Sequence, residues 1–188
     1  MKDTITSYLQ ESIAVKERIL NDAPLLTQIE SAAKILIHAI ESAGTIYLCG
    51  NGGSACDAMH FCEELVARYK RDRQGIRAMH FLDPSALTCW SNDYAYESGF
   101  ERYAQTFCTK SDCLVGISTS GNSHNVLLAV EAAKKQGCST IALLGKDGGK
   151  IAPQADVSLI VPSEETDRIQ EAHICLIHIF CELLEQQL

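Results

Sequence analysis

The chain has 188 residues, of which 46% are hydrophobic and 21% are charged, and its formal net charge is −8. This length suits one domain with a sizeable core, and the acidic balance disfavours a nucleic-acid partner, which would need a basic surface. The short basic cluster YKRDRQGIR, at 69–77, suits at most a small anion. No apolar run reaches the ~18–20 residues of a membrane span, so we expect neither nucleic acid nor a membrane as partner.

The chain contains nine cysteines, an odd number, with no C-x-x-C pair. Several lie within apolar runs, where a free cysteine packs as a small hydrophobic side chain. The polar N-terminus lacks the apolar core of a signal peptide. These features predict a reducing, cytoplasmic compartment, with no disulfide framework and no cysteine metal site.

Residues 3–43 form two predicted helices that are broken near 21–25, where Asp22 is a cap and Pro24 lies in the first turn. After this segment, strands alternate with helices up to a long final helix that starts near 165. The apolar runs predict five strands, at 45–49, 76–82, 113–118, 139–145 and 157–161. Alternation with strands that are apolar throughout is typical of a parallel sheet covered on both faces.

We therefore predict an α/β fold, with a five-stranded parallel sheet flanked by helices. A single domain spans 1–188, with an N-terminal helical segment over 1–43 and an α/β core over 44–188. The final helix has apolar residues around most of its circumference, which one sheet face cannot cover. We expect this helix to be inserted between subunits, and the N-terminal helices to serve oligomerisation.

Three strands end in unusual loops, CGNGGSACDA at 49–58, ISTSGNS at 117–123 and GKDGGK at 145–150. Ligands of open parallel sheets bind beyond the carboxyl ends of the strands. Glycines let the backbone approach a ligand, and hydroxyls and helix N-termini donate hydrogen bonds to anions. The first two loops therefore predict a cradle for a phosphate or sugar phosphate, although single serines there also serve as helix caps. The third loop is interpreted as an ordinary turn.

The cradle does not match the known nucleotide-binding motifs. The pattern G-x-x-x-x-G-K-[ST] of a phosphate-binding P-loop does not occur in the sequence. The dinucleotide-binding pattern G-x-G-x-x-G does not occur either. A small phosphorylated ligand is therefore favoured over a nucleotide.

The helix that follows the first glycine-rich loop carries His60 and Glu64 four residues apart, so both project from one face. Such a pair is often only solvated, but its position after a ligand loop favours a functional role. Glu63 points ~100° away and is expected to face solvent. In the final helix His178 lies among apolar residues, a costly place for an ionisable ring without a partner, and His173 is expected to be structural.

Five segments are recognisable as a set: CGNGGSACDAMHFCEEL (49–65), SND (91–93), LVGISTSGNS (114–123), GKDGGK (145–150) and DRIQEAHICLIH (167–178). Together they closely resemble the sugar isomerase (SIS) domain family and, within it, the phosphoheptose isomerases. The resemblance spans essentially the whole chain in the right order. It implies a Rossmann-like three-layer fold and a homotetramer with active sites at subunit interfaces.

The resemblance also implies an activity, the conversion of sedoheptulose 7-phosphate to D-glycero-D-manno-heptose 7-phosphate through an enediol. This is the first step toward ADP-heptose for lipopolysaccharide. By motif, the implied substrate contacts are Asn51, Gly52, Gly53, Asn92 and Asp93, with Ser118, Thr119, Ser120 and Ser123 at the phosphate end. The implied ligands of one Zn²⁺ per subunit are His60, Glu64, Gln170 and His178. Of these, Glu64 and Gln170 also meet substrate, and Glu64 and His178 match the acid–base pair.

Rival interpretations are a non-catalytic SIS protein that binds a replication initiator or senses a sugar phosphate, and an isomerase for another phosphosugar. Such non-catalytic relatives lack the acid–base residues as a class, whereas Glu64 and His178 are both present here. Gln170 and His178 lie ~12 Å apart along their helix, a long span for two ligands at ~2 Å from one zinc. We therefore expect Gln170 of one chain and His178 of another to meet at a shared site.

Overall fold

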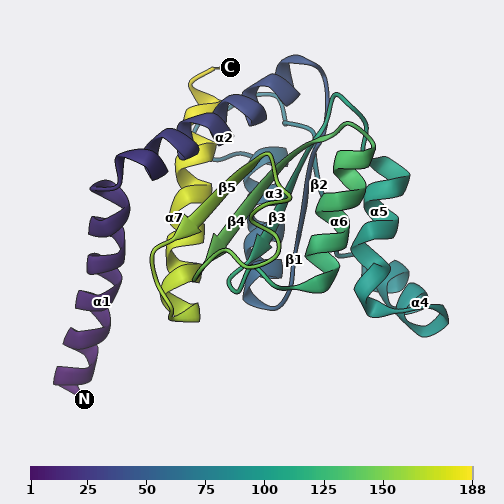
Figure 1. Ribbon diagram of the computed structural model, residues 1–188. Helices are drawn as coiled ribbons and strands as arrows, with labels where there is room; N and C mark the ends of the chain where they lie inside the picture. Colours follow the sequence, from purple (N-terminus) through teal and green to yellow (C-terminus); the bar gives the residue numbers. More distant parts are fainter. Residues whose placement is uncertain (188) are drawn as a thin grey trace.

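The computed structural model describes residues 1–187, which form one α/β unit (Figure 1). Its helices are α1 (Lys2–Leu20), α2 (Ala23–Glu41), α3 (Gly53–Val66), α4 (Pro84–Asp93), α5 (Gly99–Phe107), α6 (His124–Lys135) and α7 (Thr166–Glu185). Its strands are β1 (Ile46–Gly50), β2 (Ala78–His80), β3 (Cys113–Ser118), β4 (Ser139–Gly145) and β5 (Val157–Val161). A 3-10 turn, η1, spans Tyr96–Ser98.

The five strands form one parallel sheet in the order β2-β1-β3-β4-β5, which confirms the predicted fold class. The last three predicted strands have the observed bounds, and β1 begins one residue later than expected. The strand predicted at 76–82 is reduced to three residues. This β2 lies at the edge of the sheet and pairs only with β1, so little of the apolar run finds a backbone partner.

Side chains alternate across β1, which separates the core into two parts. Ile46 and Leu48 face the part built with α2, α3 and α7. Tyr47 and Cys49 face the part built with α5 and α6. Figure 1 shows these two helical layers on opposite sides of the sheet. The molecule therefore has three layers, and the long apolar strands are explained by burial on both faces.

The N-terminal segment breaks where the sequence predicts it. The Asp22 side chain accepts a hydrogen bond from the backbone N–H of Leu25 at 3.0 Å, which caps the start of α2. The first helix, α1, extends away from the body of the molecule (Figure 1), and Val15 is its single buried residue. Near the start of α7, Arg168 donates to the carbonyl oxygen of Tyr8 at 2.7 Å and ties α1 to the body.

The final helix is buried more completely within its own chain than the sequence suggested. Helices α1, α2 and α3 pack against α7 in addition to the sheet, and the side chains of Ile169, Leu176, Ile177 and Phe180 are buried. Ile179 remains 40% exposed. The apolar circumference of α7 therefore does not by itself require a second chain, because three helices of the same chain supply the cover. No helix within residues 1–187 is long and apolar enough to cross a membrane.

Candidate active site

Two ligand loops of the candidate site lie where the strand order reverses. The chain passes from β1 outward to β2 and then returns to β3 on the other side of β1. The loops after β1 and β3 therefore leave the same edge in different directions, which opens the crevice where ligands of such sheets bind. Helices α3 and α6 begin in these two loops, so the N-termini of both point toward the crevice.

Helix α3 carries two of the predicted chemical groups, and α7 brings a third beside them. His60 Nε2 lies 3.3 Å from the Glu64 carboxylate and 3.1 Å from His178 Nε2. One ligand atom from each residue falls within 4.8 Å of the others. The Glu64 side chain is 14% exposed and that of His60 is 40% exposed, so the group is reachable from solvent on one side.

This group has the composition and spacing of a metal site. Two imidazole nitrogens and a carboxylate oxygen are ligands that Zn²⁺ accepts. Tetrahedral coordination with Zn–N distances of ~2.0–2.1 Å places two ligand nitrogens ~3.3–3.4 Å apart. The His60–His178 separation of 3.1 Å is close to that value. The residues present therefore fit a tetrahedral divalent cation that leaves a position for a further ligand.

Glu63 is nearer to the group than the sequence suggested. Its side chain is 58% exposed, as expected for a residue facing solvent, but its carboxylate lies 3.6 Å from Nδ1 of His60. A carboxylate on the second ring nitrogen of a ligating histidine orients the ring and sets its tautomer. Glu63 is thus placed to orient His60, because three residues along a helix return the side chain to nearly the same face.

Gln170 and His178 face the same helix of their own chain. A Cβ atom placed on Gly53 would lie within 3 Å of the Gln170 side-chain amide, so the absence of a side chain at Gly53 makes room for that amide. His178 lies against His60, seven residues further along α3. Helices α3 and α7 therefore run side by side in the same direction. One chain therefore brings Glu64 and His178 together, whereas its own Gln170 lies at the start of α3, so a Gln170 that comes from another chain stays a prediction.

The serine loop, residues 118–123, borders the same crevice. Ser118 is buried at the end of β3, and its hydroxyl donates to the Ser123 hydroxyl at 2.9 Å. Ser123 occupies the N-cap position of α6 but makes no side-chain cap bond. Ser120 accepts a hydrogen bond from the Asn122 N–H at 3.1 Å, within the loop itself. Helix capping therefore does not account for these hydroxyls.

The third glycine-rich loop supports the serine loop from behind. Gly121 has φ +64°, and a Cβ atom there would lie 2.1 Å from the carbonyl oxygen of Gly148. The Ile151 N–H donates to the Gly121 carbonyl at 3.0 Å, and the Lys150 N–H donates to the Asn122 side chain at 3.2 Å. The turn interpretation of GKDGGK is confirmed, and this turn in addition holds the serine loop in place.

Two residues that sequence reasoning missed hold Asn51. The side chains of Asn51 and Asn125 exchange two hydrogen bonds, at 2.8 and 2.9 Å. The Tyr96 hydroxyl donates to the side-chain amide oxygen of Asn51 at 2.6 Å. One N–H of the Asn51 amide is left to donate to a ligand oxygen. Asn125 is buried and follows the serine loop by two residues, a weak sequence signal, whereas nothing in the sequence points to Tyr96.

The predicted residues of the SND motif are placed less directly. Asn92 and Asp93 are exposed at the end of α4, and the Asn92 amide donates to the Asp93 carboxylate at 2.9 Å. Within the described chain, these two side chains have no polar contact with the His60 group or with the serine loop. The segment that follows reaches the site through Tyr96, which bonds to Asn51.

His173 has the structural role that we expected. It is fully buried, and its Nε2 lies 2.9 Å from the carbonyl oxygen of Leu144 on β4. Burial lowers the pKa of His173 to about 4, so the ring is neutral at physiological pH. All nine cysteines are free thiols in the structure. The five buried cysteines pack as small apolar side chains.

Residues 7–145 match the SIS domain family. A phosphoheptose isomerase of Vibrio cholerae is 49% identical over 188 residues, which is all of this chain and 98% of that protein. A solved structure of the Neisseria gonorrhoeae phosphoheptose isomerase superposes with a TM-score of 0.92 at 39% identity, covering 98% of both chains. That of the Francisella tularensis enzyme has a TM-score of 0.91 at 33% identity, covering 98% of this chain and 97% of that one.

These similarities cover the strands, the glycine-rich loops and both helices of the candidate site. Relatives this similar over their full length, together with the family match, establish kinship in sequence and in fold. The chain belongs to the SIS domain family and, within it, to the phosphoheptose isomerases.

Proposed function

We propose that this protein is the aldose–ketose isomerase that converts sedoheptulose 7-phosphate to D-glycero-D-manno-heptose 7-phosphate, the first step toward ADP-heptose for lipopolysaccharide. The observation that carries the proposal is the meeting of His60, Glu64 and His178 between helices α3 and α7. The serine loop follows the carboxyl end of β3 and offers hydroxyl and backbone donors for a phosphate.

The reaction moves a hydrogen between neighbouring carbons and needs a base at carbon and a second group for the oxygens. We assign Glu64 as the base that takes the proton from C1 of the ketose and delivers it to C2. His178 protonates the C2 oxygen and removes the proton from the C1 oxygen, which completes the enediol exchange. Glu64 and His178 meet between adjacent helices, with ligand atoms within 4.8 Å of each other, which supports this division of roles.

The proposed cofactor is one Zn²⁺ per subunit, held by His60, Glu64, Gln170 and His178. When bound, zinc supplies a positive charge that polarises the substrate carbonyl. The ligand spacing supports three of these assignments. The Gln170 amide of the same chain lies against Gly53, seven residues or ~10 Å along α3 from His60, so we propose that the fourth ligand is the Gln170 of another chain. Metal analysis of the purified protein tests this assignment, with His60→Ala expected to abolish stoichiometric zinc.

We place the remaining substrate contacts on residues of the loops and of the SND motif. We assign Ser118, Thr119, Ser120 and Ser123 to the phosphate, and Asn51, Gly52, Gly53, Asn92 and Asp93 to the sugar. The single free N–H of Asn51 suits a hydroxyl oxygen of the sugar chain. Asn92 and Asp93 are the least supported members of this set, because their side chains pair with each other at the end of α4.

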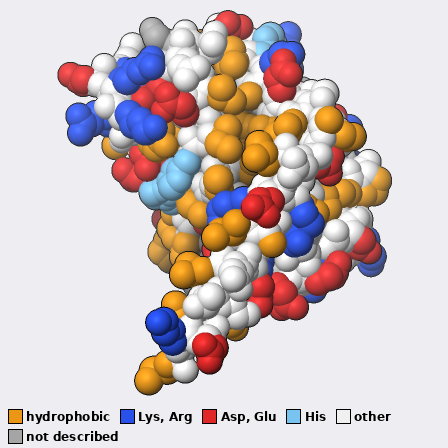
Figure 2. Space-filling model, turned by 90° about the vertical axis from the view of Figure 1, so that its left-hand side faces the viewer, with side chains coloured by type: hydrophobic (Ala, Val, Ile, Leu, Met, Phe, Trp, Pro, Cys, Tyr) orange, Lys and Arg blue, Asp and Glu red, His pale blue; other side chains and the backbone are white. Residues whose placement is uncertain are grey.

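We propose a homotetramer with active sites near subunit interfaces. Helix α1 exposes Ile5, Leu9 and Ile13, with exposed fractions of 60%, 61% and 55%. An apolar groove of about 330 Å³ lies between α1, α2 and α7, with Leu20, Leu26 and Ile179 in its walls. Figure 2 shows apolar side chains in a band over this face. Exposed apolar surface of this kind marks protein interfaces, and native mass spectrometry tests for four copies.

A cytoplasmic location is proposed on a separate observation. The nine cysteines include five buried in the core, and all nine are free thiols. Such usage is typical of a reducing compartment.

The rival functions are a non-catalytic SIS protein that binds a replication initiator, and a sugar-phosphate sensor. We test them by incubating the protein with sedoheptulose 7-phosphate and following the heptose 7-phosphate product by NMR. Isomerisation that is lost in Glu64→Gln and kept in Glu131→Gln, a matched change on α6, supports the proposal. Binding of the sugar phosphate without turnover in the wild-type protein contradicts it and favours a sensor. If the protein isomerises only a different ketose phosphate, that sugar phosphate replaces sedoheptulose 7-phosphate as the assigned substrate.

A further inference from the structure

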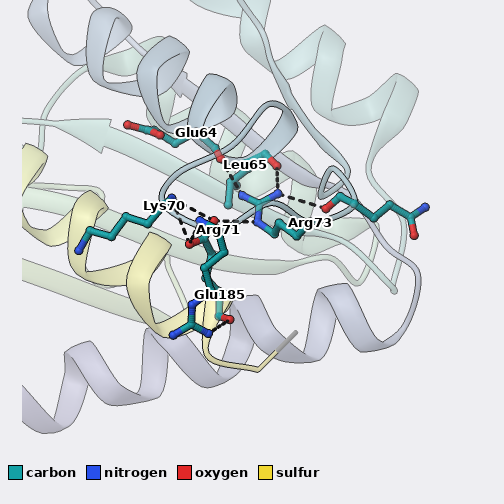
Figure 3. Close-up of polar contacts among 7 residues, drawn as sticks. Glu64, Leu65, Lys70, Arg71, Arg73 and Glu185 are labelled. Atoms are coloured by element: carbon teal, nitrogen blue, oxygen red, sulfur yellow. Dashed lines mark hydrogen bonds and ion pairs between the residues drawn. The ribbon is translucent and has the colours of Figure 1, made fainter.

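Helix α3 ends at an arginine from the following loop. The Arg73 guanidinium donates from Nη2 to the carbonyl oxygen of Glu64 at 2.8 Å and from Nη1 to that of Leu65 at 2.9 Å (Figure 3). These carbonyls belong to the last turn of the helix, where intrahelical partners are missing. Arg73 therefore caps the C-terminal turn of α3 through the backbone of Glu64 itself, and its positive charge also suits that end of the helix.

The same guanidinium is anchored to the other helix of the site. Arg73 Nε donates to the Glu185 carboxylate at 3.0 Å, and the two side chains are only 8% and 2% exposed. The Glu185 carboxylate also accepts hydrogen bonds from the backbone N–H groups of Lys70 and Arg71, at 3.1 Å each. Figure 3 shows these groups converging where α3, the loop and the end of α7 meet. Glu185 is thus fully engaged in holding the loop.

This arrangement links the ends of the two helices that carry the candidate chemistry. Glu185 follows His178 by seven residues, which is two turns of α7 and nearly the same face. Arg73 is bonded to the residue whose side chain is the proposed base. A shift of either helix along or away from the other would have to break the Arg73 bonds. The link is therefore placed to set the distance between Glu64 and His178.

We infer that Arg73 and Glu185 are positioning residues, which fix Glu64 and His60 of α3 relative to His178 of α7. The inference rests on the proposed roles of those three residues. It also explains the basic cluster at 69–77, which is not a free anion site at these positions. Lys70 pairs with Glu182 at 2.8 Å, and Arg71 and Arg73 bond to Glu185.

Only arginine satisfies this geometry. Three separate nitrogens of one planar group reach three partners on two helices. A lysine ammonium is a single point donor on a flexible chain and cannot span the carboxylate and both carbonyls at once. Arg73→Lys therefore keeps the buried charge beside Glu185 but releases the end of α3. A displacement of ~1 Å at a reacting group is enough to cost ~10²-fold in rate.

The experiment compares kcat, KM and zinc affinity, the last by competition with a chelator, in three variants. For Arg73→Lys we expect kcat ~10–100-fold lower, zinc ~10-fold weaker and KM changed less than about threefold. The double variant Arg73→Met with Glu185→Gln leaves no unpaired buried charge, so it should fold, and we expect the same losses. Asp112→Asn is the control, because Asp112 accepts three hydrogen bonds before β3, from Thr45 and Thr109, and none from α3, α7 or the loop that carries Arg73.

The control should lower the melting temperature while kcat and zinc affinity stay unchanged. Wild-type kcat and zinc affinity in both Arg73 variants would overturn the inference. It would also be overturned if Asp112→Asn, at the same melting temperature as the Arg73 variants, lost as much kcat and zinc affinity as they do. Glu64→Gln measured in parallel separates the two proposals. If Glu64→Gln is also fully active, the assignment of the base fails. If only the Arg73 variants are active, the positioning role alone fails.

Discussion

The two ends of the candidate site are built in different ways. His60, Glu64 and His178 stand on two long helices that pack together and are linked by Arg73 and Glu185. The serine loop is a short connection between β3 and α6, held from behind by the turn at Gly148. Proton transfer needs side chains at fixed separations, whereas several hydrogen-bond donors bind a phosphate together, so each contributes only part of the affinity. We therefore expect single substitutions to be far more damaging at the helical end.

The largest effect is expected at the helical end. Glu64→Gln or His178→Gln should lower kcat by ~10²–10⁴-fold with the fold intact, because each removes one proton-transfer group. Turnover of sedoheptulose 7-phosphate measures this, and circular dichroism checks the fold. Near-wild-type turnover in either variant would remove that residue from the mechanism.

Mixing these two inactive variants tests whether Glu64 and His178 of one site come from the same chain. One chain supplies both groups to one site, so subunit exchange cannot create a site with both wild-type residues. We expect activity to stay at the mutant baseline after exchange is verified by mass spectrometry. Recovery of activity would mean that the groups are shared between chains.

At the loop end, the backbone is more sensitive than any hydroxyl. Gly121→Ala adds a Cβ that collides with Gly148 at a positive φ, and we expect the free energy of unfolding to fall by ~2–4 kcal/mol. Gly52→Ala is the matched control, since its φ is also positive but the space is open, so only ~1 kcal/mol is expected. Urea unfolding measures both, and equal losses would show that the support from Gly148 is unimportant.

A buried histidine on α7 makes the stability of the fold sensitive to acid. His173 of α7 is neutral in the folded state, where burial lowers its pKa to about 4, while its unfolded pKa is ~6.5. The free energy of unfolding is therefore not reduced by His173 above pH ~6.5. It falls as the pH drops from ~6.5 toward 4, by up to about 3 kcal/mol, because the unfolded state binds the proton first. His173→Gln should flatten this part of the stability curve in urea unfolding. His38→Gln, an exposed change on α2, should leave the slope unchanged.

The smallest effect is expected for the serine hydroxyls. Ser118→Ala combined with Ser120→Ala should raise KM for the sugar phosphate by ~10-fold and change kcat less, because backbone donors remain. Steady-state kinetics separates the two constants. A loss in kcat with unchanged KM would move these hydroxyls from the phosphate to the reacting end.

Features that depend on neighbouring residues were predictable. Apolar runs located β3, β4 and β5 because strands buried on both faces need them. Asp22 was recognisable as a cap, and the spacing of His60 and Glu64 placed both on one face of α3. His173, on another face of α7 than His178, was expected to be structural, which is the default for such a histidine, and it is bonded to Leu144. In each case the decisive interaction is at most a few residues away or follows from burial alone.

Features that join distant segments were decided by the tertiary structure. His60 and His178 are 118 positions apart, Arg73 and Glu185 are 112 apart, and Asn51 and Asn125 are 74 apart. Helical and strand periodicity states which face a side chain occupies but not which other face it meets. The packing of α7 along α3 settles those pairs, and it also explains why one chain covers a helix that looked too apolar for it. The sequence by itself determined the parts of the site, and their distances came from how the helices pack.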